Sequence, residues 1–416
     1  MTRAEEIIRQ RIRDRGRITF AEFMELALYG PGGYYTSRTP IGRRGDYYTS
    51  PSAHPMFGAL LALQLEQLWR LLDAPSRFVV VEPGAGDGRL ALDVLAYARR
   101  LDAAFARALE YVAVDRFPRP GPGGPAANFS GGPGGPAARI SWLRGECTPL
   151  RELTGCVLSN ELVDSMPVHR VAMTGGRLRE LYVTLADGSL AEEAGEPSTP
   201  EIAEMLGSQG VRLEEGWQAE VGLGARRWME GVAASLRRGY VLTIDYGDPA
   251  EGLYTEARKA GTVMSYYQHT PQADVLARVG LQDMTAHVNF TTLVQAGRKR
   301  GLEPVALMDQ GSFLRNLGAG LFIDRQRREP LPQAETQANL MAMRDLVKPG
   351  GLGAFRVLLQ AKDAPVAGLA CVDESSSEEE AWRRRLESLP VPMLTPEHLD
   401  LLAARYPHQA RGWQSS

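Results

Sequence analysis

Cysteine is scarce in this chain, which excludes a small secreted domain stapled by disulfides. The 416 residues contain three cysteines, an odd number without metal-ligand spacing: Cys147, Cys156 and Cys371. Such usage is typical of a reducing compartment. The six histidines are scattered too, and none is paired at ligand spacing. The sequence therefore predicts no metal site.

Long apolar runs and a strong charge of one sign are also missing. No stretch approaches the ~20 apolar residues that a membrane-spanning helix needs, so we expect no membrane span. The net charge of −3 supplies no general attraction to nucleic acid, and we expect no nucleic-acid partner. The composition is otherwise that of an ordinary globular protein, with 44% hydrophobic and 23% charged residues.

The beginning of the chain lacks the features of a targeting segment. It is charged where a secretory signal should be apolar, and it carries acids that are atypical of a transit peptide: Glu5, Glu6 and Asp14. Together with the low cysteine content, this start predicts a soluble protein of the cytoplasm.

Five apolar-rich segments recur at the spacing of strands in an α/β domain. They are residues 78–82, 111–115, 155–159, 240–245 and 353–359. Several are almost continuously apolar, as strands covered on both faces of a sheet are. Helical patterns separate them. The sequence therefore predicts an α/β fold with a Rossmann-like sheet and helices on both faces.

Further elements are expected around this sheet. Residues 4–30 read as two helices, the second of which follows Thr19, with Glu22 three positions later in capping-box spacing. A β-hairpin is expected within residues 168–185, and a helix at 218–238.

These patterns divide the chain into five regions. We expect an N-terminal helical segment at 1–75, a cofactor-binding core at 76–249, an inserted α+β substrate lobe at 250–350, a final core strand at 351–362, and an acidic linker with docking helices at 363–416. Within the core, the heptapeptide Gly-Pro-Gly-Gly-Pro-Ala-Ala occurs at 121–127 and again at 132–138. Such low-complexity sequence cannot build a core, so it predicts a flexible surface loop.

The most informative motif follows the first expected strand. That strand ends in an acid, and three alternate glycines lead into a helical pattern: Glu82, then Gly84, Gly86 and Gly88. Glycine lets the backbone turn sharply and approach a ligand closely. A nicotinamide or flavin site would have its third glycine three positions after the second. The two-residue spacing is the pattern of S-adenosylmethionine (SAM) methyltransferases. We therefore expect SAM as the cofactor, the alternative being an ordinary strand–turn–helix corner.

A second acid follows at the distance of one crossover connection. Asp115 closes the next apolar run, 33 residues after Glu82. A carboxylate in this position can accept hydrogen bonds from both ribose hydroxyls of an adenosine nucleoside. The alternative is a strand-end aspartate that caps a turn.

A polar cluster comes directly after the expected strand at 155–159. Asn160, Glu161 and Asp164 should lie at the carboxyl edge of the sheet, where ligands bind in open α/β folds. Glu161 and Asp164 could hold a guanidinium in a bidentate grip. Alternatively, Asn160 caps a helix and the acids favour its dipole. The two interpretations can coexist.

Five motifs in order resemble the MidA family of SAM-dependent methyltransferases. They are Gly42-Arg-Arg-Gly45-Asp46-Tyr-Tyr-Thr49-Ser50-Pro51, Glu82-Pro-Gly-Ala-Gly, Ser159-Asn-Glu-Leu-Val-Asp-Ser-Met-Pro167, Ile244-Asp-Tyr-Gly247 and Thr285-Ala-His-Val-Asn-Phe290. The resemblance covers about residues 4–360. It implies a methyltransferase core with an inserted lobe. In the mitochondrial branch of the family it also implies a protein arginine methyltransferase that acts on a subunit of complex I.

The resemblance also assigns roles to individual residues. It places Gly45, Asp46 and Thr49 against the cofactor, as a lid from the N-terminal segment. His287 lies in an alternating pattern typical of a strand, where a histidine is usually part of the core. The family match makes it a candidate of the catalytic site.

Three further residues are candidates for contacting the substrate. Asp245 and Tyr246 end a core strand beside the same edge, where structural capping is an equally good interpretation. His169 lies just past Pro167 and could instead form the base of the hairpin.

Three functions remain open. The first is methyl transfer from SAM to an arginine of a protein partner. The second is N- or O-methylation of a small molecule, because the family usually has Glu after Pro51 and Asp at 289, where this chain has Ser52-Ala53 and Asn289. The third is a non-catalytic assembly protein that keeps the fold. The methyl acceptor is thus a protein or a small molecule, and the oligomeric state is open.

Overall fold

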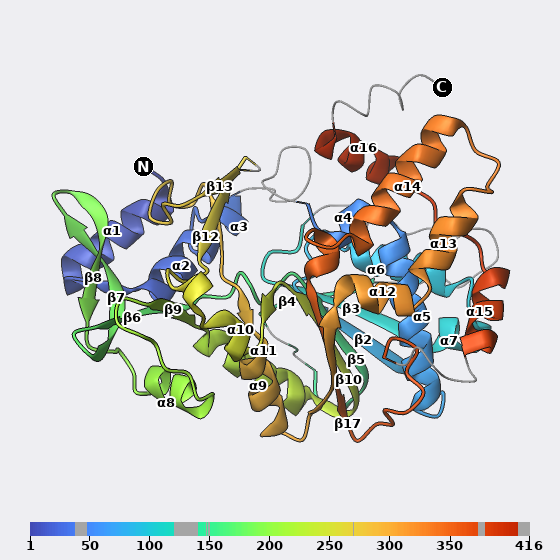
Figure 1. Cartoon of the computed structure of the whole chain (residues 1–416), viewed down its shortest axis with the longest axis horizontal. Coiled ribbons are helices and arrows are strands. Elements are labelled where there is room, and N and C mark those ends of the chain that lie inside the picture. Colours follow the sequence, from blue (N-terminus) through green and yellow to red (C-terminus); the bar gives the residue numbers. More distant parts are fainter. Residues whose placement is uncertain are drawn as a thin grey trace. The chain divides into compact units, whose positions relative to one another are not determined.

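The computed structural model describes residues 1–37, 48–119, 140–146, 148, 150–268, 270–372 and 379–406. The chain forms two compact units (Figure 1). The first unit comprises residues 1–47, 162–230 and 246–299, and the second comprises 48–161, 231–245 and 300–416. The repeated heptapeptides lie outside the described residues. So do Gly45 and Asp46.

The second unit is built around a seven-stranded sheet. Its strand order is β16-β17-β10-β5-β2-β3-β4. The bounds are Phe78–Pro83 for β2, Leu109–Asp115 for β3, Ile140–Arg144 for β4, Leu153–Asn160 for β5, Leu236–Asp245 for β10, Glu303–Asp309 for β16 and Arg356–Lys362 for β17. Strands β4, β3, β2, β5 and β10 are parallel, whereas β17 is antiparallel to both β10 and β16.

This strand order positions a site. The chain proceeds from β2 to β3 on one side and later returns to β5 on the other side of β2. Such a reversal leaves a crevice outside the carboxyl ends of the strands, where ligands bind in open α/β sheets. All five expected strands are present. The last begins at Arg356 instead of residue 353, because Leu352–Ala354 forms a 3₁₀ turn.

Apolar helices cover the sheet of the second unit. Helix α5 (Met56–Leu71) and helix α6 (Arg89–Ala98) pack against each other (Figure 1). Their apolar side chains join those of β2, β5 and β10 in one core. The unit also contains α4 (Ser50–Ala53), α7 (Ala103–Ala108), α12 (Gln310–Asn316), α13 (Ala319–Gln326), α14 (Gln333–Val347), α15 (Glu379–Ser388) and α16 (Pro396–Arg405).

The expected substrate lobe at 250–350 is divided between the two units. Residues 246–299 cluster with the first unit, but 300–350 belong to the second. The physical reason is that β16 extends the large sheet, where it pairs with β17 from Glu303 opposite Ala361 to Asp309 opposite Arg356. Helices α12 and α14 then pack beside this edge.

The first unit combines small sheets with helices. Its five-stranded sheet contains β1 (Ile18–Thr19), β6 (His169–Thr174), β7 (Arg177–Ala186), β8 (Ser189–Gly195) and β9 (Gln218–Val221). Three short strands form a second sheet and two more form a pair: β12 (Met264–Tyr267), β13 (Thr270–Gln272) and β14 (Asp283–Thr285), and β11 (Gly247–Asp248) with β15 (Val288–Asn289). Its helices are α1 (Arg3–Arg15), α2 (Phe20–Tyr29), α3 (Tyr34–Ser37), α8 (Glu201–Ser208), α10 (Ala250–Leu253), η1 (Glu256–Arg258) and α11 (Phe290–Arg298).

Local signals in the first unit predicted its two N-terminal helices and its hairpin. The expected hairpin is β6 and β7, and the Thr19 side chain accepts a hydrogen bond from the Glu22 N–H at the start of α2. The expected helix at 218–238 is wrong at its beginning. Residues Gln218–Val221 form β9, because they pair with β6, and the helix α9 covers only Leu223–Ser235. In the described part of the chain, no helix is long and apolar enough to cross a membrane.

The C-terminal segment is part of the core of the second unit. The Leu386 side chain of α15 is buried in this core. Arg385 forms an ion pair with Glu66 of α5, whose side chain is fully buried. Glu66 also pairs with Arg70 at 3.0 Å. A buried carboxylate of this kind depends on its cationic partners.

Replacing Arg385 with alanine should therefore destabilise the protein. The change leaves the buried Glu66 with Arg70 as its remaining ion-pair partner. We expect a loss of about 3 kcal/mol in the free energy of unfolding, measured by urea denaturation. Arg384→Ala is the matched control, because Arg384 lies on the same helix with an exposed side chain and should change stability by less than about 0.5 kcal/mol. Equal effects of the two changes would contradict this account.

Candidate functional site

The glycine motif forms the turn between β2 and α6. Gly84, Gly86 and Gly88 all have positive φ angles, of 76°, 58° and 73°. This left-handed region suits glycine, because a side chain there is strained. A Cβ atom added to Gly86 would meet nothing within 4 Å. The backbone of the turn therefore borders open space on the side of Gly86.

The Asp115 carboxylate holds this turn in place. The Gly86 N–H donates to Asp115 Oδ2 at 2.9 Å, and the Phe117 N–H donates to Oδ1 at 2.7 Å. The Gly84 N–H donates to the Val114 carbonyl at 2.8 Å. Asp115 thus has the turn-capping role that was one of its two expected roles. Each carboxylate oxygen has a second lone pair, so the role toward a ribose is compatible with these contacts.

Glu82 is a buried acid at the base of the turn. The Tyr111 O–H donates to Glu82 Oε2 at 2.8 Å. Burial raises the pKa of Glu82 to about 8. The Tyr111 hydrogen bond acts in the opposite direction, and the charges of Asp87 and Asp115 raise the pKa further. The carboxyl group is therefore mostly protonated at pH 7.

Glu161 is fixed at the carboxyl end of β5, next to β2. Its φ of 51° is uncommon for a residue other than glycine. Its N–H donates to the Ile244 carbonyl of β10 at 2.9 Å. Glu161 Oε1 accepts two hydrogen bonds of 3.0 Å, from the Ser50 N–H and from Asn160 Nδ2. These contacts determine where the carboxylate points.

Three other expected site residues of this unit lie close to these contacts along the chain. Asn160 Oδ1 is buried and accepts no hydrogen bond from the residues that the structure describes. Thr49 precedes Ser50 and caps α4, with its N–H donating to Ser52 Oγ at 2.9 Å. Asp245 ends β10, and its side chain is fully buried.

In the first unit, Asp164, Tyr246 and His287 are brought together. The Tyr246 side chain hydrogen-bonds the Asp164 carboxylate. The Tyr246 ring meets the His287 ring edge-on, with centroids 5.4 Å apart. The Ala286 N–H donates to the Asp164 carbonyl at 2.9 Å, and the Val288 N–H donates to the Tyr246 carbonyl at 3.0 Å.

The environment of this group shifts two pKa values. Burial raises the pKa of Asp164 to about 6, although the hydrogen bond from Tyr246 lowers it. Burial and the nearby positive charge of Arg258 lower the pKa of His287, so its ring is neutral at pH 7. The expectation that His287 lies within a strand is wrong, because it falls between β14 and β15. The chain there leaves one small sheet and joins another.

His169 begins β6 and is oriented by a buried acid. Its Nδ1 lies 2.7 Å from Glu180 Oε1 in β7, and the Glu180 side chain is fully buried. This places His169 at the base of the hairpin, one of the two positions that the sequence left open for it.

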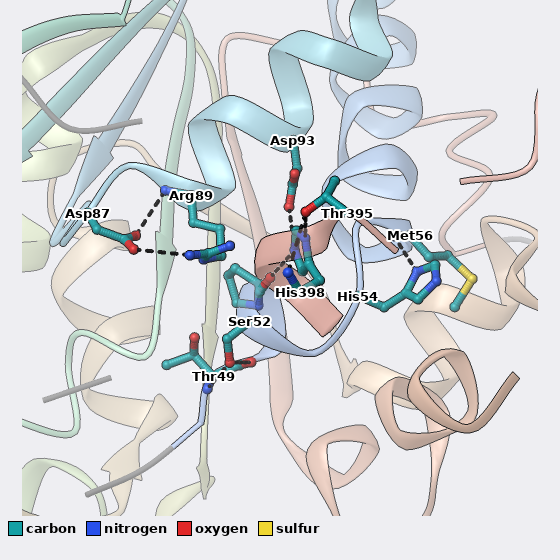
Figure 2. A network of polar contacts seen from close by, with 10 residues as sticks. Thr49, Ser52, His54, Met56, Asp87, Arg89, Asp93, Thr395 and His398 are labelled. Atoms are coloured by element: carbon teal, nitrogen blue, oxygen red, sulfur yellow. Dashed lines mark hydrogen bonds and ion pairs between the residues drawn. The ribbon is translucent and has the colours of Figure 1, made fainter. Parts of the chain in front are cut away.

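Sequence reasoning missed the contacts that α4 makes with distant segments. Figure 2 shows Thr49 and Ser52 near the beginning of α6, with His398 of α16 close by. His398 Nε2 lies 3.1 Å from the Pro51 carbonyl and 3.3 Å from Asp93 Oδ2 (Figure 2). No signal in the sequence joins residues more than 300 positions apart. Tyr111, the donor to Glu82, was visible only as an apolar strand residue.

The raised pKa of Glu82 allows a test of whether the cofactor binds beside this residue. Because the carboxyl group holds a proton at pH 7, a cationic ligand beside it should release that proton. We expect SAM binding at pH 7 to release a proton, seen by calorimetry in two buffers with different ionisation enthalpies. In Glu82→Gln this release should disappear. Proton release of the same size in wild type and Glu82→Gln would contradict the placement of the cofactor beside Glu82.

A model of one protein family matches residues 60–308. That family is described as "Putative S-adenosyl-L-methionine-dependent methyltransferase". The matched segment covers more than half of the chain and includes the glycine turn, Asp115 and Glu161.

Curated relatives are similar over most of their length. The chain is 28% identical to the Drosophila melanogaster protein arginine methyltransferase NDUFAF7 homolog, mitochondrial, over 78% of this chain and 77% of that protein. It is 27% identical to the human protein arginine methyltransferase NDUFAF7, mitochondrial, over 74% of this chain and 71% of that protein.

A solved structure is also similar. It is a candidate methyl transferase from Burkholderia thailandensis, bound to S-adenosyl-homocysteine. The two chains are 30% identical, the match covers 90% of this chain and 96% of that one, and the TM-score is 0.74. These comparisons confirm the α/β methyltransferase fold and SAM as the cofactor.

One expectation is contradicted. The relatives from fly, mouse and human are named as mitochondrial proteins, so the assignment to the cytoplasm is wrong. That assignment was based on acids near the start and few cysteines. Neither feature identifies a compartment.

Proposed function

The chain belongs to the S-adenosyl-L-methionine-dependent methyltransferase family, and we propose that it methylates an arginine side chain of a partner protein. Two lines of evidence support a protein arginine as the methyl acceptor. The relatives from fly and human are named protein arginine methyltransferases and match over more than 70% of their length. Glu161, directly after β5, also supplies a carboxylate of the kind that binds a guanidinium.

The residues of the second unit fit the cofactor. Open space borders Gly86, where a Cβ would otherwise point. Asn160 Oδ1 is a buried acceptor that an ammonium group could satisfy. Asp115 would accept hydrogen bonds from the ribose hydroxyls. The proposed set of cofactor-binding residues also includes Glu82, Gly84, Gly88 and Thr49. The Gly45 and Asp46 assignments remain proposals from the resemblance.

The observation that carries the proposal is the fixed carboxylate of Glu161. It lies at the end of β5, directly beside the strand that leads into the glycine turn. The cofactor supplies an activated methyl group when bound, so the protein mainly has to align the acceptor with it. Arginine stays protonated in solution at neutral pH. Glu161 would orient the guanidinium and favour loss of its proton as transfer proceeds.

The remaining assignments concern recognition of the acceptor. Within the first unit, the group of Asp164, Tyr246 and His287 combines an acid and two rings, which would suit a cationic side chain. Asp245 is fully buried at the end of β10, and His169 pairs with Glu180. For both of these residues a supporting role fits the contacts better than direct contact with substrate.

The alternative of a small-molecule acceptor was based on departures from the family pattern at Ser52-Ala53 and at Asn289. In the structure, Ser52 and Asn289 both cap helices. Ser52 Oγ accepts from the Thr49 N–H in the cap of α4. The Asn289 side chain accepts from the Thr292 N–H at the start of α11 and donates to Gln209 and Tyr254. The caps give Ser52 and Asn289 structural roles, which supports a protein acceptor over a small molecule.

Glu161→Gln should stop methyl transfer while sparing SAM binding. In an assay with methyl-labelled SAM, we expect labelled methylarginine in a protein, identified by mass spectrometry. Loss of the carboxylate should slow transfer by at least about 100-fold. SAM affinity from calorimetry should stay within about threefold. Glu152→Gln is the matched control, because Glu152 is exposed at the opposite end of β5. Full activity of Glu161→Gln, or label only in a small molecule, would contradict the proposal.

The Tyr246–Asp164 contact predicts a change in pH dependence. If transfer needs ionised Asp164, kcat/KM should fall below a pH of about 6, the value to which burial raises the pKa of Asp164. Tyr246→Phe removes a hydrogen bond that lowers this pKa, so the acid limb should move to higher pH. Asp164→Asn should lack this limb in its residual activity. An acid limb that stays in place or moves to lower pH in Tyr246→Phe would contradict the assignment.

A further inference from the structure

Helix α4 is a single turn that cannot be stable by itself. It spans Ser50–Ala53, and one turn fixes several backbone angles for very few hydrogen bonds. Yet its residues are buried. Its place must therefore be determined by the side chains around it.

Three side chains from C-terminal helices hold α4. The Ser50 O–H donates to Gln310 Oε1 of α12 at 3.2 Å. His54, directly after α4, lies with Nε2 3.1 Å from Asn339 Oδ1 of α14. His398 of α16 lies with Nε2 3.1 Å from the Pro51 carbonyl, in the middle of the turn.

The contacts of His398 define its orientation. Its Nε2 lies 3.1 Å from the Pro51 carbonyl, which can only accept, and 3.3 Å from the Asp93 carboxylate, so we assign the hydrogen to Nε2. Nδ1 lies 2.8 Å from Thr395 Oγ1, whose O–H can donate to it. The imidazole is 2% exposed, so no water competes for these partners. Figure 2 shows the ring between α4 and the side of α6 that carries Asp93.

The packing of α16 against α14 does not explain why a histidine occupies position 398. Leu402, one turn further along α16, is buried against Ala338 and Ala342 of α14. An apolar residue at 398 would add to that packing without the cost of burying polar atoms. The imidazole instead makes a directed contact with the α4 backbone.

The other end of α4 contacts the proposed catalytic acid. The Ser50 N–H donates to Glu161 Oε1 at 3.0 Å, one residue before the carbonyl that His398 holds. We propose that His398 is a positioning residue for Glu161, acting through α4, so that the C-terminal helix α16 completes the catalytic edge of the sheet. This inference rests on the proposed role of Glu161.

Hydrogen exchange tests the contact without an activity assay. In His398→Ala, the amides of Ser50, Ser52 and Ala53 should exchange at least about tenfold faster than in wild type, by mass spectrometry of the peptide that contains them. His398→Gln should restore most of the protection, because its Nε2 can donate to the Pro51 carbonyl. Asp400→Ala is the matched control, since Asp400 is exposed on the same helix. Wild-type protection in His398→Ala, with melting confirming that the variant is folded, would overturn the inference.

The kinetics of methyl transfer distinguish a positioning effect on Glu161 from a general loss of rigidity in the protein. We expect kcat to fall about 10- to 100-fold in His398→Ala, as for a slightly misplaced catalytic group, and to recover largely in His398→Gln. The effects of His398→Ala and Glu161→Gln on single-turnover transfer should be strongly non-additive, because one acts through the other. Fully additive effects would overturn the inference. Failure of the proposed function appears differently, as an unchanged rate in Glu161→Gln alone.

Discussion

The contact between the Asp115 carboxylate and the glycine turn is the interaction on which the rest of the site depends. Three residues with left-handed backbone follow one another at alternate positions. Within the turn the Gly88 N–H donates to the Ala85 carbonyl at 2.8 Å, whereas the partner of the Gly86 N–H comes from outside the turn. Asp115 supplies the missing constraint by accepting from the Gly86 and Phe117 N–H groups. The turn is thereby held against the end of β3, with open space beside Gly86 and with Glu82 buried at its base.

A second constraint fixes the acid on the neighbouring strand. Glu161 follows β5, which pairs with β2, and its carboxylate is held by Asn160 and by the first N–H of α4. The turn proposed to bind the cofactor and the acid proposed to bind the acceptor therefore follow adjacent parallel strands of one sheet. Methyl transfer requires little chemistry from the protein beyond alignment, and rigid neighbouring strands are well suited to supply it.

The elements that could be predicted from the sequence depend on local or periodic signals. Apolar runs predicted the five strands, and the Thr19–Glu22 spacing predicted the start of α2, because these signals act over a few residues. The glycine spacing predicted the cofactor for the same reason. Contacts between distant segments were beyond sequence reasoning: β16 beside β17, Arg385 on Glu66, and His398 on α4. The sequence pattern wrongly predicted a helix at residues 218–221. These residues form a strand because they pair with β6, and their own propensity does not indicate that pairing.

If the turn anchored by Asp115 is the cofactor site, calorimetric titration of S-adenosyl-homocysteine into Asp115→Ala should show weak binding. Loss of the carboxylate frees the Gly86 N–H and removes the proposed ribose acceptor. We expect the affinity to be at least about 100-fold weaker than in wild type, with Asp115→Asn in between, in a protein that keeps its circular dichroism and melting transition. Wild-type affinity in a folded Asp115→Ala variant would contradict the assignment of this turn as the cofactor site.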